Sequence, residues 1–147
     1  MKPLGSVVGA MTCVFCAIVA GDIPSQRIHE DDRVVAFLDI QPLARGHALV
    51  IPKVHAEKLE DADPEDAGAL LRAAQTLAPR LCAAVGAQDA TIAINNGPDA
   101  GQEVPHVHLH IVPRQAGDAA GPVHALFTKR PEPDADDLAA IAAEVAQ

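Results

Sequence analysis

The segment 106–114 constrains the fold of this 147-residue chain more than any other part of it. From His106 to Ile111, histidine alternates with an aliphatic residue. A period of two residues is typical of a β-strand, in which successive side chains point to opposite faces of the sheet. The segment is therefore predicted to be a strand with one buried apolar face and one face of imidazoles. The apolar face holds Val107, Leu109 and Ile111, and the opposite face holds His106, His108 and His110.

Three imidazoles on one strand face indicate a functional site. Neighbours on such a face lie roughly 6.6 Å apart, and neutral imidazole is a proton carrier, a nucleophile and a metal ligand near pH 7. One histidine on a strand is usually solvated or hydrogen-bonded, whereas two are often a metal pair. The residues alone leave two interpretations open: a metal site, and a metal-free catalytic or phosphate-binding site.

Composition limits the classes of partner. The chain is long enough for one domain with a proper core, and its net charge of −9 provides no broad positive surface for nucleic acid or an anionic membrane. Three phenylalanines are its only aromatic residues of the Phe, Tyr and Trp class, too few for a stacking platform for long nucleic acid. Three cysteines fit no disulfide framework and indicate a reducing compartment. We expect a cytoplasmic protein.

The uncharged N-terminal stretch is not read as a signal peptide or a membrane span. Gly5 and Gly9 interrupt it, Cys13 lacks the context of a cleavage site, and the stretch continues directly into the rest of the fold. We expect a loose tail over 1–10 and a single domain over 11–147.

The turn and capping residues in the rest of the sequence predict an α+β fold with a mainly antiparallel, five-stranded sheet. A long helix is predicted from Pro64, with Asp63 as its cap, to a stop at Gly86, with a kink at Pro79. A second helix is expected over 134–147. The expected strands are 26–30, 33–39, 47–53, 91–95 and 106–114.

The loop between Asn95 and Gln102 precedes the histidine strand. Its composition is that of an ordinary β-turn connection, but its glycines also free backbone N–H groups to approach a ligand. Phosphate is bound by amide and imidazole donors that converge from two sides. Beside three histidines, the loop is consistent with an oxyanion site.

The pair Cys13 and Cys16 has three interpretations: half of a metal site, a redox pair, or two buried thiols. A redox role has little support, because no strand–motif–helix context surrounds the pair.

The histidine segment resembles the His-φ-His-φ-His-φ-φ signature of the histidine-triad (HIT) superfamily of nucleotide hydrolases and transferases. The similarity covers about residues 13–114 and is most specific to the bacterial Hint-type branch. It implies a HIT fold whose sheet extends across a homodimer. The further matching segments are 13–25, 36–40, 46–53 and 95–102.

The resemblance implies an enzyme that cleaves purine nucleotide conjugates, either phosphoramidates or dinucleoside polyphosphates, at the α-phosphate. His108 would attack and become nucleotidylated, and water would then release the nucleoside monophosphate. His110 and His47 match donors to the phosphate oxygens, whereas Asn95 and Gln102 match residues that orient phosphate and leaving group. No catalytic metal is implied.

One position matches the nucleoside subsite of the family, and two apolar residues lie beside it. Asp39 corresponds to a ribose-binding carboxylate, and Phe37 and Ile40 would wall the base pocket. From the residues alone, Asp39 is more simply explained as a strand-end carboxylate in a turn, and the two apolar residues as core.

The resemblance also implies a structural zinc site of the Cys₂His₂ type, formed by Cys13, Cys16, His55 and His106. His29 and His124 match no motif and are expected to be solvated. One departure is Glu103, at a position where some eukaryotic relatives carry a serine that interacts with the leaving group.

Two rival functions stay open. A phosphorylase would pass the nucleotidyl group to inorganic phosphate instead of water, and a nucleotide-binding or interaction module would turn over substrate only incidentally. The complete polar set favours an enzyme; it comprises His47, Asn95, Gln102, His108 and His110.

Overall fold

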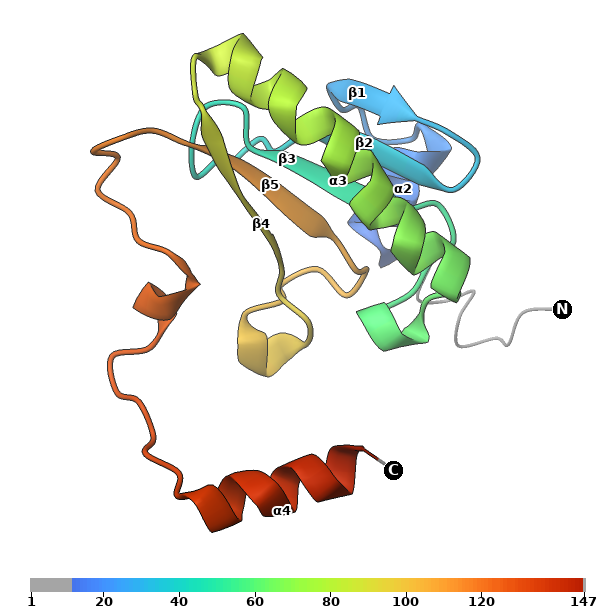
Figure 1. The fold of residues 1–147 in the computed structure, drawn as a ribbon. Helices are drawn as coiled ribbons and strands as arrows, with labels where there is room; N and C mark the ends of the chain where they lie inside the picture. The colour runs from blue at the N-terminus through green and yellow to red at the C-terminus, as the bar shows by residue number, and fades with distance from the viewer. Residues whose placement is uncertain (1–11, 147) are drawn as a thin grey trace, which may run out of the picture.

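The computed structural model describes residues 12–146 and contains a five-stranded antiparallel sheet of order β1-β2-β3-β5-β4 (Figure 1). This confirms the predicted α+β class. The strands are β1 (Arg27–Glu30), β2 (Val34–Leu38), β3 (Ala48–Pro52), β4 (Asp89–Ile94) and β5 (Leu109–Arg114). The α-helices are α2 (Val14–Ala20), α3 (Pro64–Val85) and α4 (Ala135–Val145), and the 3₁₀ turns are η1 (Leu59–Asp61), η2 (Pro98–Ala100) and η3 (Val123–Leu126). The tail expected over 1–10 lies outside the described residues.

The central strands are buried on both faces because each face packs against a different helix. Alternate residues of β2 and β3 form a large aliphatic cluster with α3, which crosses one face of the sheet (Figure 1). The other residues of the same strands form a smaller cluster with α2. This double burial explains why β2 and β3 read as continuous apolar runs.

The histidine segment keeps the predicted alternation of faces but not the predicted strand length. Regular pairing begins only at Leu109, and the preceding residues are extended chain anchored by the Val107 N–H, which donates to the Ala56 carbonyl (2.8 Å). Val107, like Leu109, packs in the cluster beneath α3. The imidazoles of His106 and His108 lie on the opposite face and contact the ring of Phe15.

The ends of α3 follow the predicted signals. The Asp63 carboxylate accepts from the Glu65 N–H (2.8 Å), and Gly86 ends the helix in the left-handed conformation. Pro79 lies inside the helix, which continues through it as one element.

Helix α2 was not expected from the sequence. Cys13 caps it, with Sγ accepting from the Cys16 N–H, and Gly21 ends it at φ 84°. The helix buries Phe15 and Ile18 against the sheet face that carries the histidines. It therefore supplies one wall of the site described below.

The expected C-terminal helix is present as α4, drawn apart from the sheet in Figure 1. Its apolar residues are all exposed, among them Leu138 and Ile141 at 55% and 53%. Within residues 12–146, no helix combines the length and the hydropathy needed to cross a bilayer.

Candidate active site

A cavity of about 510 Å³ lies on the α2 side of the sheet. Its walls come from α2, the C-terminal end of β2, β3, the start of β5 and the loop that follows β4. This cavity brings together most of the residues that the sequence predicted for the site. They are Phe37, Asp39, Ile40, His47, Asn95, His108 and His110.

The backbone fixes the tautomer of His108. Its Nδ1 lies 2.8 Å from the carbonyl oxygen of His106, which can only accept, so Nδ1 carries the proton. In the neutral ring, Nε2 then keeps its lone pair. His108 is 7% exposed and lines the cavity. This arrangement suits a nucleophile held in one orientation.

A second chain of hydrogen bonds fixes His47 and His110. The Leu43 N–H donates to His47 Nδ1 (3.0 Å), so the proton of neutral His47 resides on Nε2. His47 Nε2 then donates to His110 Nδ1 (2.9 Å), which leaves the proton of His110 on Nε2. That buried N–H has no partner within the described part of the chain. It is a free donor beside His108, as an oxyanion site requires.

Electrostatics keep this histidine pair neutral. Burial lowers the pKa of His47 against a smaller opposing effect of Asp39. Burial, and then the neighbouring His108 and His47, lower the pKa of His110 to about 4. Both rings are therefore neutral donors at pH 7 rather than cations.

The low pKa of His110 predicts a pH-dependent stability. The unfolded chain has an ordinary histidine pKa near 6.5, so between pH 6.5 and about 4 it binds a proton that the folded site excludes. The free energy of unfolding should fall with decreasing pH over that window, by at most about 1.4 kcal/mol per pH unit for this group. Urea unfolding of wild type and His110→Gln at pH 7, 6 and 5 measures the difference. Identical slopes for the two proteins would contradict this assignment.

Apolar residues and one carboxylate line the opposite part of the cavity. Phe37 meets Phe15 edge-to-face (ring centroids 5.7 Å), and Phe15 also lies against His108 (5.1 Å). Asp39 accepts from the Gln41 N–H (2.8 Å), and its other oxygen lies 3.7 Å from His47 Nε2. Phe15 was not predicted as a site residue from the sequence. The helix that carries it is nevertheless bounded by two recognisable signals, the cap at Cys13 and the glycine after Ala20.

The structure separates the two amide residues predicted for the phosphate. Asn95 lines the cavity, whereas Gln102 does not. The Gln102 side chain accepts from the Gly97 N–H (2.8 Å) and donates to the carbonyls of Glu57 and Val104. Its amide holds the loop in shape.

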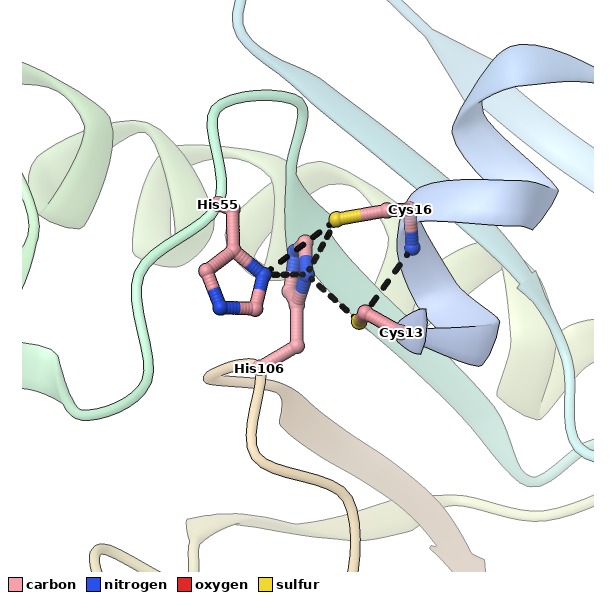
Figure 2. Close-up of side chains that lie close together, drawn as sticks. All are labelled: Cys13, Cys16, His55 and His106. Carbon is pink, nitrogen blue, oxygen red and sulfur yellow. Dashed lines mark hydrogen bonds between the residues drawn. The ribbon is translucent and has the colours of Figure 1, made fainter. Parts of the chain in front are cut away.

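Cys13, Cys16, His55 and His106 converge beside the cavity (Figure 2). His106 Nδ1 lies 3.4 Å and 3.5 Å from the two sulfurs and 3.2 Å from His55 Nδ1. Tetrahedral zinc with its usual bond lengths places ligand atoms about 3.6 Å (S···N) and about 3.3 Å (N···N) apart. His106 Nε2 donates to the Pro52 carbonyl (2.9 Å), which leaves Nδ1 free to coordinate, as metal-bound histidine requires. The donor set fits zinc.

A second group of potential ligands, Asp39, His47 and His110, lies within the cavity. The hydrogen bonds of its imidazoles differ from those of His106. A metal-bound imidazole normally donates through its second nitrogen, whereas the second nitrogen of His47 accepts from the Leu43 N–H. The two histidines are therefore better suited to donating hydrogen bonds to a phosphate than to binding a metal ion.

Comparison with known proteins decides the family. The HIT domain family matches residues 20–117. The chain belongs to the HIT family. An uncharacterized HIT-like protein of Mycobacterium tuberculosis is 46% identical over 84% of this chain and 85% of its own length. An adenosine 5′-monophosphoramidase of Schizosaccharomyces pombe is 43% identical over 71% of this chain and 75% of its own. An adenylylsulfatase of Arabidopsis thaliana is 38% identical over 72% and 54%, respectively.

Solved structures of HIT proteins share the fold. The Streptococcus mutans protein SMU.412c superposes with a TM-score of 0.82 at 39% identity, covering 92% of this chain and 83% of its own. A zinc-bound histidine-triad protein from Mycobacterium smegmatis gives a TM-score of 0.72 at 42% identity, with 93% and 97% covered. The resemblance inferred from the histidine motif is confirmed, including its bacterial relatives.

Proposed function

We propose that this HIT protein hydrolyses or transfers nucleoside monophosphates from purine nucleotide conjugates through a covalent adduct on His108. The observation that carries the proposal is the hydrogen bond from His108 Nδ1 to the His106 carbonyl, in a cavity where His110 Nε2 is a free donor. Two relatives whose names state hydrolysis of adenylyl conjugates support the substrate class.

In the proposed reaction, His108 Nε2 attacks the α-phosphorus and the bond from phosphorus to the leaving group breaks. The leaving group departs with the bonding electrons and takes up a proton from solvent. The resulting nucleotidyl-imidazolium keeps its Nδ1–H on the His106 carbonyl, which stabilises its positive charge. The N–H of His110 stabilises the phosphate oxygens. Water then attacks phosphorus and loses a proton to solvent, the bond from phosphorus to Nε2 breaks, and His108 leaves as the neutral ring.

The remaining cavity residues are assigned by position. The apolar wall formed with Phe37 and Phe15 accepts the base, and Ile40, 90% exposed at the rim, covers it. Asp39 receives the ribose hydroxyls, and Asn95 orients the phosphate. Gln102 acts indirectly, by shaping the loop that carries its neighbours.

The cluster of Cys13, Cys16, His55 and His106 is proposed to hold a structural zinc ion. When bound, zinc would cross-link α2, the segment after β3 and the start of the histidine segment. His106 would then serve twice: its ring holds the metal and its carbonyl orients His108. A reducing compartment such as the cytoplasm is proposed because three cysteines fit no disulfide framework.

We further propose a homodimer. Within residues 12–146, strand β4 pairs only with β5 and its other edge is open. Ile92 of this strand is 43% exposed. Pairing of this edge with a second copy would extend the sheet and remove the unpaired edge.

A substrate panel tests the function. Adenosine 5′-phosphoramidate and diadenosine tetraphosphate are incubated with the protein, with and without inorganic phosphate, and the products are separated. We expect the phosphoramidate to yield adenosine monophosphate under both conditions. Adenosine diphosphate formed only with added phosphate would instead identify a phosphorylase. Tight nucleotide binding without product would identify a binding module.

A further inference from the structure

The charges that line the cavity are unusual for a phosphate site. Among its described lining residues, none is lysine or arginine, and two are the carboxylates Asp39 and Glu103. The only other ionisable side chains are histidines, two of which have lowered pKa values. The α-phosphate therefore meets neutral N–H donors, which can serve one phosphate group.

Further phosphates would meet no cation there. Enzymes that bind polyphosphate chains surround them with arginine, lysine or metal ions. In this cavity, a leaving group built of additional phosphates would meet the carboxylate of Glu103 instead. The lining charge thus favours leaving groups that are neutral or positive.

Glu103 lies where it can select leaving groups by their charge. The residue lies between Gln102, whose side chain fixes the loop, and Val104, which packs against the cluster containing Phe15. Its side chain is exposed at the cavity, and within residues 12–146 no hydrogen bond or ion pair engages it. Asp39, which follows the last residue of β2, instead accepts from the Gln41 N–H and lies 3.7 Å from His47 Nε2. Glu103 is the carboxylate left free for a ligand.

Building on the proposed function, we propose that Glu103 selects nucleotide conjugates whose leaving group carries a positive charge, such as an amine with a second ammonium group. The carboxylate attracts the ammonium group while His108 attacks phosphorus, and it repels anionic leaving groups. Glu103 acts on the choice of substrate and takes no part in bond breaking.

The test uses three adenosine phosphoramidates whose side arms have equal length and end in ammonium, hydroxyl or carboxylate. For wild type at low salt, we expect kcat/KM to decrease in that order by about fivefold per step and about thirtyfold overall, because one charge pair in water is worth about 1 kcal/mol, or about fivefold, and the pair is attractive for ammonium and repulsive for carboxylate. At 1 M salt, the difference in kcat/KM between the substrates should become smaller, because salt screens the charge of Glu103. Glu103→Gln should reduce the difference in kcat/KM between the ammonium and carboxylate substrates to about twofold. It should leave kcat/KM for the hydroxyl substrate nearly unchanged.

Asp99→Asn is the matched control, since it removes a carboxylate from the same loop but outside the cavity lining. It should keep the wild-type ranking. The proposal is overturned if Glu103→Gln keeps the full ranking or if wild type shows none. Failure of wild type to turn over even the hydroxyl substrate is a separate result, which refutes the proposed function and this inference with it.

Discussion

Replacement of His108 with alanine is expected to lower the rate of nucleotide release by at least about four orders of magnitude, the scale seen when a covalent nucleophile is removed. No other ring in the cavity can replace it. Neither His47 nor His110 has a free lone pair, because their Nδ1 atoms accept from the Leu43 N–H and from His47 Nε2, respectively. His106 faces the cysteines. Chromatographic assay of released monophosphate measures the effect.

Two comparisons calibrate that result. His110→Ala should lose about 10²–10³-fold, since it removes one donor to the phosphate but keeps the nucleophile. His29→Ala should stay within about twofold of wild type, because His29 lies on β1, outside this cavity, and pairs with Asp31. A His108→Ala protein with wild-type turnover would refute the mechanism.

The second large effect is expected at the cysteine–histidine cluster. Cys16→Ser should abolish stoichiometric zinc binding and lower the free energy of unfolding by at least about 3 kcal/mol, because binding free energy at a structural zinc site is folding free energy. For a chain of this size, that loss corresponds to a fall in Tm of about 10 °C. Metal analysis of the purified protein and thermal unfolding measure the two effects.

Cys82→Ala is the matched control for thiol loss. Cys82 is buried in α3, where its Sγ contacts the Asp89 carbonyl. In the described part of the chain, it belongs to no group of potential metal ligands. This variant should keep one zinc ion per chain. Protein purified under reducing conditions that contains no metal, or that forms a Cys13–Cys16 disulfide instead, would refute the zinc assignment. Because His106 joins the cluster to His108, metal loss should also lower kcat more than it changes KM.

The sequence predicted the features that depend on the local alternation of apolar and polar residues and on helix-capping residues. Alternation around His108 assigned its neighbours to the correct faces, and Asp63 and Gly86 marked the ends of α3. Such features follow from strand geometry and capping, which adjacent residues decide. Through the family resemblance, the sequence also predicted four candidate zinc ligands from distant segments, and the structure brings these residues together.

Other features depend on contacts that no local pattern encodes. The tautomer of His47 is set by the Leu43 N–H, a backbone group present in every non-proline residue. The Gln102 amide is used by the loop around it, so its residue type alone did not reveal its orientation. Helix α4 was predicted from its amphipathic pattern, but a pattern does not specify what its exposed apolar face packs against.

The most direct test of the central claim is to trap the adduct. Wild-type protein is mixed with adenosine phosphoramidate, quenched rapidly under alkaline conditions that preserve phosphorus–nitrogen bonds, digested, and examined by tandem mass spectrometry. We predict one adenylyl group on the peptide that contains 106–114, localised to His108, formed and lost at rates that account for turnover. Product formation with no adduct, or with the adduct on another residue, would contradict the account.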